Sequence, residues 1–244
     1  MKQPLFVVIA VSLLALVACD APGRPSAYSE EVAAAAVTDF KTLYATNCAG
    51  CHGSDGKNGP AVEIGDPVYL AIADDAVIRR VVSKGVAGTG MPAFEQSAGG
   101  MLTSTQVDAI VTGTRMQWAK ADVLRGADPP PYAPSSLTNE VGDAERGKDV
   151  YALYCSSCHG LDGKGGPRGS SIVDGPYLSL VSDQHLRTTV IIGRPGLGAP
   201  DWRSNVPGKP MSHQDVSDVV AWLAEQRPQF MTQLKLKPGR GGIQ

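Results

Sequence analysis

The sequence contains one short motif twice, and this repeat constrains the fold more than any other feature. NCAGCHGSDGKNGP (residues 47–60) returns as YCSSCHGLDGKGGP (residues 154–167), with Cys155 standing 107 positions after Cys48 (155 − 48). Upstream of the motifs, the matched residues are Lys41, Tyr44 and Ala45 in the first copy and Lys148, Tyr151 and Ala152 in the second. Repetition of whole segments at a fixed spacing indicates two copies of one domain.

The segment between the copies is rich in proline. GADPPPYAPSSLTNEVGD (residues 126–143) favours extended polyproline geometry and a semi-rigid spacer. Each copy then spans fewer than ~100 residues, a size at which a hydrophobic core alone is marginal and a bound cofactor usually helps. The expected organisation is a signal peptide (1–18), an N-terminal tether (19–35), a first domain (36–120), a Pro-rich linker (121–142), a second domain (143–230) and a C-terminal tail (231–244).

The hydrophobic pattern of each copy predicts helices joined by long loops. Val37, Phe40, Leu43 and Tyr44 follow helical spacing and lead directly into Cys48. Further helices are expected over residues 74–83 and from residue 103, with Thr103 or Ser104 as N-cap, and over residues 144–154, 183–192 and 212–226 in the second copy. Strand signals are weak throughout, so the predicted fold class is all-α.

Each motif has the pattern C-x-x-C-H, which is the attachment signature of c-type haem. The residues concerned are Cys48, Cys51 and His52 in the first copy and Cys155, Cys158 and His159 in the second. On one helical turn, two sulfurs can reach the two vinyl groups on one haem edge, and the adjacent histidine can ligate the iron. Zinc would normally need further Cys or His ligands, and a redox dithiol needs neither the immediate histidine nor the Gly- and Pro-rich loop. We therefore predict two covalently attached haems.

The fifth cysteine, Cys19, closes an N-terminal export signal. Lys2 precedes an apolar run (residues 5–17) that is too short to span a bilayer comfortably. The run ends in LVAC (residues 16–19), which resembles the lipobox of bacterial lipoproteins, whose cysteine carries lipid. The resemblance implies a chain anchored by lipid at Cys19 on the periplasmic face of a membrane, inner or outer. An ordinary secretory signal with an incidental cysteine is the alternative.

From about residue 38 to residue 226, each half of the chain resembles a class I cytochrome c. The resemblance implies that Pro60 and Pro167 pack beside the haem and that their carbonyls accept a hydrogen bond from the proximal imidazole. It also implies close contact between the first and last helices of each domain, with a glycine on one and an aromatic residue on the other. Phe40 would face Gly113 in the first domain, and Gly147 would face Trp222 in the second.

The resemblance assigns the sixth iron ligand to a methionine in a later loop. GTGMPAF (residues 88–94) has this pattern, so Met91 is the predicted ligand in the first domain, with core packing as the alternative. In the second domain GLGAPDW (residues 196–202) places Ala199 where Met91 stands, and a methyl group cannot ligate iron. The alternatives there are Met211, which aligns with the packing residue Leu102, either of the histidines His213 and His185, and no protein ligand at all. Met211 is the favoured prediction.

These features together predict a dihaem electron carrier. The formal net charge of −2 gives no basic field for nucleic acid, and no nucleotide fingerprint or Ser/His/Asp arrangement adds catalysis. The expected donor is a quinol-oxidising complex or dehydrogenase, and the expected acceptor is an oxidase, a reductase or a soluble cytochrome. The chain would act alone or as a subunit of a larger redox complex. The alternative, which Ala199 keeps open, is a peroxidase-like or thiosulfate-oxidising dihaem enzyme with a reactive second haem.

Overall fold

The computed structural model describes residues 33–134 and 141–228. The chain divides into two compact units, Met1–Ala36 and Val37–Gln244, and both motifs lie in the second unit. In the first unit, the described residues form a 3-10 turn, η1 (Ala34–Ala36).

The predicted signal peptide, the predicted lipidation site at Cys19 and the predicted tail (231–244) lie outside the described residues. Among the residues that the structure describes, no helix is both long enough and apolar enough to cross a membrane.

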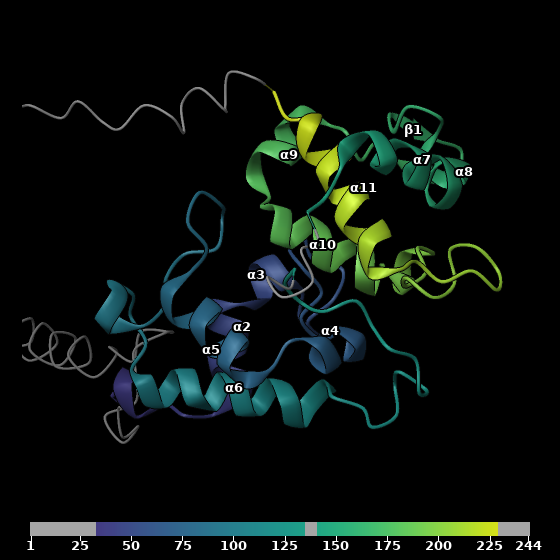
Figure 1. Ribbon diagram of the computed structural model, residues 1–244. Coiled ribbons are helices and arrows are strands. Elements are labelled where there is room, and N and C mark those ends of the chain that lie inside the picture. The colour runs from purple at the N-terminus through teal and green to yellow at the C-terminus, as the bar shows by residue number, and fades with distance from the viewer. Residues whose placement is uncertain (1–32, 135–140, 229–244) are drawn as a thin grey trace, which may run out of the picture. The chain divides into compact units, whose positions relative to one another are not determined.

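The two copies of the repeat fold into the same succession of short helices and loops (Figure 1). The elements of the first copy are α2 (Phe40–Asn47), α3 (Ala49–His52), α4 (Pro67–Ile72), α5 (Asp75–Lys84), η2 (Gln96–Ala98) and α6 (Ser104–Trp118). Those of the second are α7 (Ala144–Tyr154), α8 (Ser156–His159), β1 (Gly165–Gly166), β2 (Gly169–Ser170), α9 (Gly175–Leu180), α10 (Asp183–Ile192), η3 (Pro195–Leu197) and α11 (His213–Glu225). The strands pair antiparallel as a small hairpin, with Gly165 opposite Ser170. The predicted all-α fold class is confirmed.

Side-chain caps explain where the helices begin. Thr103 and Ser212 start α6 and α11 with capping boxes, in which the side chain of the cap and that of the third helical residue each accept from the other's backbone N–H. Asp66 and Asp174 start α4 and α9, each just ahead of a proline in the first helical turn. The hydrophobic pattern alone did not predict α4 and α9, because six residues are too few to show helical periodicity.

The first and last helices of each domain make the predicted aromatic–glycine contacts. A Cβ atom added to Gly113 of α6 would overlap the ring of Phe40, and one added to Gly147 of α7 would overlap Trp222 and the backbone of Asp218. Both predicted pairs are therefore confirmed. The large residue is on the first helix in one domain and on the last helix in the other, which keeps the total volume at the crossing similar.

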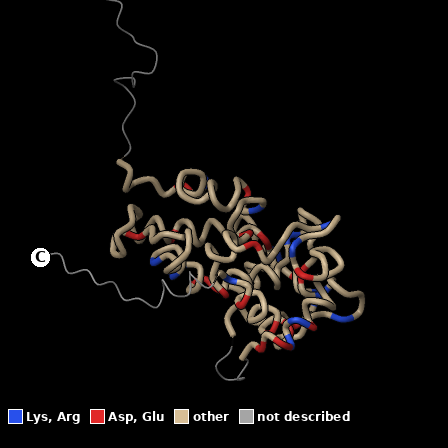
Figure 2. Tube along the Cα trace, turned by 90° about the horizontal axis from the view of Figure 1, so that it is seen from above, with Lys and Arg blue, Asp and Glu red and all other residues tan. Residues whose placement is uncertain are grey.

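Segments from both copies share a buried core. One hydrophobic cluster includes Ile110 of α6, Ile191 of α10 and Val216 of α11. Pro131 and Tyr132 pack onto α10, because Arg187 Nε donates to the Pro131 carbonyl at 3.0 Å and the Gln184 amide donates to the Tyr132 carbonyl at 2.6 Å. Figure 2 shows acidic and basic residues interspersed along the trace, in keeping with the net charge of −2.

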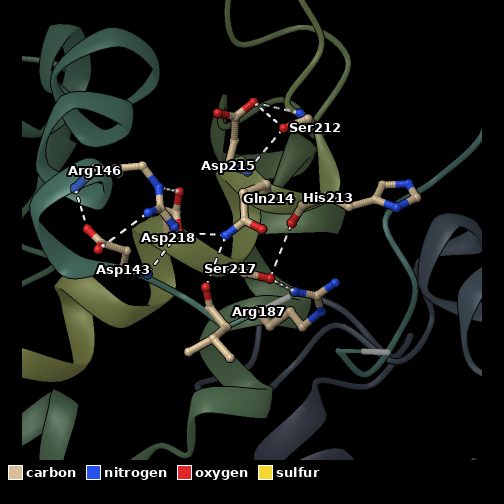
Figure 3. A network of polar contacts seen from close by, with 10 residues as sticks. Asp143, Arg146, Arg187, Ser212, His213, Gln214, Asp215, Ser217 and Asp218 are labelled. Carbon is tan, nitrogen blue, oxygen red and sulfur yellow. Dashed lines mark hydrogen bonds and ion pairs between the residues drawn. The ribbon is translucent and has the colours of Figure 1, made fainter. Parts of the chain in front are cut away.

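A buried polar network fastens the start of α11 to α7 in the second domain (Figure 3). The Asp218 carboxylate is 2% exposed and accepts from the Asp143 backbone N–H, Arg146 and the Gln214 amide, each at 2.8 Å. Burial alone would raise the pKa of Asp218, but these hydrogen bonds and the Arg146 charge outweigh it and lower the pKa. In Figure 3 the His213 side chain points away from this network.

Candidate haem-binding sites

The first motif forms a single helical turn directly after α2. Cys48 is both the last cap of α2 and the first cap of α3, and its carbonyl accepts from the backbone N–H of Cys51 at 3.1 Å and of His52 at 3.0 Å. Cys155 joins α7 to α8 in the same way in the second motif. Both motifs therefore present two thiols and one imidazole from adjacent positions of one turn.

A backbone carbonyl orients the imidazole of His52. His52 Nδ1 lies 2.7 Å from the Val62 carbonyl oxygen, and because a carbonyl only accepts, Nδ1 carries the proton and Nε2 keeps its lone pair for a metal. Burial lowers the pKa of His52, although the hydrogen bond to Val62 opposes this effect. A neutral, buried imidazole with one oriented nitrogen has the form that metal-ligating histidines take.

The second imidazole is held in the same way by a different element. His159 Nδ1 lies 2.7 Å from the carbonyl oxygen of Ser170, which belongs to β2. The acceptor follows the histidine by 10 residues in the first domain (62 − 52) and by 11 in the second (170 − 159).

The prediction that the Pro60 and Pro167 carbonyls accept these bonds is wrong. After Pro60, the Ala61 N–H donates to the Cys51 carbonyl at 3.0 Å, and this turn leaves Val62 to present its carbonyl to the ring. Pro167 lies in the turn between β1 and β2, so the returning strand supplies the acceptor instead.

A tyrosine of the preceding helix closes the loop after each motif. Tyr44 donates its hydroxyl hydrogen to the Gly53 carbonyl at 2.8 Å, and Tyr151 donates to the Gly160 carbonyl. Gly53 and Gly160 have φ of 82° and 80°, a conformation that favours glycine. The two tyrosines matched in the repeat, but the sequence carried no sign of this role.

The thiols do not resemble those of a redox dithiol. Burial raises the pKa of Cys48 to about 11 and that of Cys155 to about 12, with a smaller contribution from the neighbouring thiol of each motif. Reactive dithiols instead have lowered thiol pKa values, in electropositive surroundings. Within the described residues, no group of three or more Cys, His, Asp or Glu side chains converges to hold a metal ion. The donor set fits a haem edge with an iron ligand beside it.

Met91 and Ala199 occupy the same backbone position in their domains. The Met91 carbonyl accepts from the Val86 N–H at 3.0 Å, and the Ala199 carbonyl accepts from the Arg194 N–H at 2.9 Å. The preceding glycines, Gly85 and Gly193, both have φ of 66° and leave no room for a Cβ atom beside the returning loop. The backbone of the two loops therefore matches at these positions, and Ala199 has a methyl group where Met91 has a thioether.

Met211 lies where Leu102 lies in the first domain. The Leu102 N–H donates to the Phe94 carbonyl at 2.7 Å, and the Met211 N–H donates to the Trp202 carbonyl at 2.9 Å. Met211 is 3% exposed and belongs to the hydrophobic core. This placement supports the packing role that the alignment allows, and ligation by Met211 stays a prediction.

The two remaining histidines lie in separate surroundings. His185 is partly buried with its ring centroid 6.2 Å from that of Tyr177, and burial, with nearby His52 and Arg194, lowers its pKa to about 4. His213 Nε2 lies 3.8 Å from a carboxylate oxygen of Asp128.

Comparisons with known proteins match both halves of the chain. The family model described as cytochrome C oxidase, cbb3-type, subunit III matches residues 35–112, and the one described as cytochrome c matches residues 144–227. The cytochrome bc1 complex cytochrome c subunit of Mycobacterium bovis is 26% identical over 208 residues, which cover 83% of this chain and 68% of that protein. The Cbb3-type cytochrome c oxidase subunit FixP of Azorhizobium caulinodans is 25% identical over 175 residues, which cover 70% of this chain and 55% of that protein.

Among solved structures, one chain of the Kuenenia stuttgartiensis reducing HAO-like protein complex Kustc0457/Kustc0458 matches 78% of this chain at 18% identity, with a TM-score of 0.42. The two family models, the two attachment motifs and the two oriented imidazoles agree on one assignment. The chain consists of two cytochrome c domains in tandem, each with a covalently attached haem, and it belongs to the dihaem c-type cytochromes.

Proposed function

We propose that this protein transfers electrons between redox partners of a bacterial respiratory chain, as a tethered carrier or as a subunit of a larger redox complex. The observation that carries the proposal is the recurrence of one site, in which His52 and His159 are each held by a backbone carbonyl at 2.7 Å. The relatives named as cytochrome c subunits of a bc1 complex and of a cbb3-type oxidase support this setting.

A haem in each domain supplies a one-electron iron couple. The chain's own residues keep each site rigid. The thiols of Cys48, Cys51, Cys155 and Cys158 serve as the covalent tethers, and the carbonyls of Val62 and Ser170 fix the imidazoles. Because both rings are held by backbone, little of the protein has to move when the charge of a site changes. Met91 is our proposed sixth ligand in the first domain.

The proposed donors are a quinol-oxidising complex or a dehydrogenase, and the proposed acceptors are an oxidase, a reductase or a soluble cytochrome. The acidic and basic residues interspersed along the trace in Figure 2, with a formal net charge of −2, suit transient docking to such proteins better than binding to nucleic acid. We also propose a lipid anchor at Cys19 on the periplasmic side. Mass spectrometry of the membrane-extracted protein tests the anchor, since a Cys19→Ser variant should lose the lipid mass and leave the membrane.

A spectroelectrochemical titration of the mature holoprotein tests the electron-transfer function. Two one-electron couples, and reduction by a quinol-oxidising membrane fraction, are expected. A protein that holds fewer than two haems, or that no respiratory donor reduces, would overturn the proposal.

Carbon monoxide and peroxide test the alternative of a dihaem enzyme, which Ala199 keeps open because its methyl group stands at the backbone position of Met91. Tight carbon monoxide binding at the second haem together with peroxide turnover would support the enzyme. Two low-spin haems that neither bind carbon monoxide nor react with peroxide would support an electron carrier without enzymatic activity.

A further inference from the structure

One arginine of the second domain reaches into the haem-binding loop of the first. Arg194 Nη2 donates to the Gly59 carbonyl at 2.8 Å, and its Nε donates to a carboxylate oxygen of Glu63 at 3.2 Å. The Glu63 side chain is only 3% exposed, whereas that of Arg194 is 29% exposed. Removing the partner of a buried carboxylate destabilises the folded protein, because an uncompensated buried charge remains. The Arg194–Glu63 pair therefore differs from an ion pair between two exposed side chains.

The groups that Arg194 holds flank the carbonyl that orients His52. Gly59 and Glu63 stand on either side of Val62, whose carbonyl oxygen lies 2.7 Å from His52 Nδ1. Glu63 also accepts from the Asn58 backbone N–H at 3.2 Å, which ties both ends of this loop together. The Arg194 guanidinium therefore braces the segment that fixes the proximal imidazole of the first domain.

The backbone of the same residue braces the opposite loop of its own domain. The Arg194 N–H donates to the Ala199 carbonyl at 2.9 Å, and the Ala199 N–H donates back to the Arg194 carbonyl at 3.2 Å. Val86 holds the corresponding position in the first domain, where its N–H makes the same bond to Met91, but its side chain cannot form an ion pair. The cross-domain link is thus a feature of the second copy alone.

We propose that Arg194 is a positioning residue that couples the two haem sites and tunes the reduction potential of the first. The inference rests on the attachment of one haem to each motif. The Arg194 cation offsets the Glu63 anion beside the first site. Without the cation, the remaining buried anion favours the more positive ferric state and lowers the potential. Without the anion, the remaining cation has the opposite effect.

Redox titration of the full-length holoprotein tests the proposal with Arg194→Gln, Arg194→Lys, Glu63→Gln and the double variant Arg194→Gln/Glu63→Gln. Arg194→Gln should lower the reduction potential of the first-domain haem by about 59 mV, which corresponds to a tenfold change in the equilibrium constant of a one-electron couple. Glu63→Gln should raise that couple, and Arg194→Lys and the double variant should fall closer to the wild-type value. The first-domain couple is assigned by its displacement in a Met91→His variant.

The control variant is Arg227→Gln, which removes an equal charge from another guanidinium that donates to backbone carbonyls and to a carboxylate. Arg227 donates to two carbonyls at 3.0 and 3.1 Å and to a carboxylate at 2.5 Å, all within the second domain. Its loss should leave the first-domain couple in place. Nuclear magnetic resonance of the His52 ring should change in Arg194→Gln and not in the control.

Equal shifts in Arg194→Gln and Arg227→Gln, or shifts of the same sign in Arg194→Gln and Glu63→Gln, would overturn the proposal. Should Arg194→Gln fail to fold, Glu63→Gln should still raise the potential of the first-domain couple, and Arg194→Lys should still leave it close to the wild-type value. A haem count on the wild type separates this outcome from failure of the proposed function. Fewer than two haems in the wild type would refute the function itself, whereas two haems with unshifted potentials in every variant would refute only the role of Arg194.

Discussion

The last helices of the two domains make the same contacts from different sequence positions. In the first domain, the Trp118 ring packs against Tyr44, with centroids 5.0 Å apart, and covers Gly56. In the second domain, the Trp222 ring stacks on Tyr151 at 4.3 Å and covers Gly163. Trp222 nevertheless aligns with Gly113 and not with Trp118, when Val107 is matched to Val216 (222 − 109 = 113).

An arginine in or just after the last helix of each domain also takes a different sequence position, in the direction opposite to that of the tryptophan. Arg115 of α6 donates to the carbonyls that end α4, those of Leu70 and Ala73, and pairs with Asp75 at 2.6 Å. Arg227, just after α11, makes the equivalent contacts to Leu178, Val181 and Asp183 in the second domain. By the same alignment Arg227 stands at the position of Trp118 (227 − 109 = 118).

The exchange shows what the fold requires of this helix. One aromatic ring must cover the tyrosine and the glycine of the attachment loop. One guanidinium must donate hydrogen bonds to the carbonyls at the end of α4 or α9. Neither requirement fixes the sequence position of the residue along the helix, because long side chains from adjacent helical turns can reach the same contact. The Phe40–Gly113 crossing explains the shift, since Phe40 occupies the space that Trp222 fills in the second domain.

The largest expected effect comes from exchanging the residues that differ at the iron-facing loops. Met91→Ala should lower the potential of the first haem markedly, because a thioether ligand raises the potential of haem iron. Ala199→Met should raise that of the second haem and bring the two couples together. Spectroelectrochemistry measures both shifts. Met101→Ala is the control, since Met101 is 81% exposed and should change neither couple. Unchanged couples in Met91→Ala would contradict the ligand assignment.

Overpacking the second helix crossing tests whether the aromatic–glycine exchange is real. Gly147→Phe should lower the free energy of unfolding by about 3 kcal/mol, because the new side chain meets Trp222 and the Asp218 backbone. Trp222→Gly in the same chain should recover part of the loss by recreating the arrangement of the first domain. Denaturant unfolding measures both values. Gly50→Ala is a control, as a Cβ atom there meets nothing within 4 Å.

If Arg115 and Arg227 make equivalent contacts, removing either should lower the free energy of unfolding by a similar amount. Arg115→Gln and Arg227→Gln should each cost about 1–3 kcal/mol, because each leaves helix-end carbonyls and a carboxylate without their charged donor. Thermal unfolding of the holoprotein, followed at each haem, measures the two losses. A large loss for one arginine and none for the other would show that the exchange is not a true equivalence.

The Asp218 network should make the second domain sensitive to acid at a position where the first domain has no carboxylate. Its folded-state pKa is lowered, so its contribution to stability is complete above the unfolded-state pKa of ~3.9 and is lost as the pH falls below that value. Ala109 stands at the corresponding place in the first domain (218 − 109) and has no charge. Unfolding curves between pH 5 and pH 2 should show a loss in the wild type that Asp218→Asn reduces. An identical acid loss in Asp218→Asn would contradict this assignment.

The smallest expected effect tests the placement of Met211. Met211→Leu reproduces the residue of the first domain and should cost less than ~1.5 kcal/mol, with an unchanged spectrum of the second haem. If Met211 instead ligates the iron, the spectrum and magnetic resonance of that haem will change in Met211→Leu and in Met211→Ala alike.

The sequence by itself determined the features that depend on neighbouring residues. The two attachment turns follow from C-x-x-C-H, and the starts of α6 and α11 follow from Thr103 and Ser212 with their capping partners. The aromatic–glycine crossings were predicted from the resemblance to class I cytochromes c, and the repeat supplied the alignment in which large and small residues changed sides.

Only the tertiary structure decided which groups meet across long separations. The carbonyls of Val62 and Ser170, and not those of the prolines, reach the imidazoles because loop closure places them there. The contacts of Arg194 to Gly59 and Glu63 join residues more than 130 positions apart. Such pairings depend on how the loops and the two domains pack, and no local pattern of hydrophobicity or capping records that.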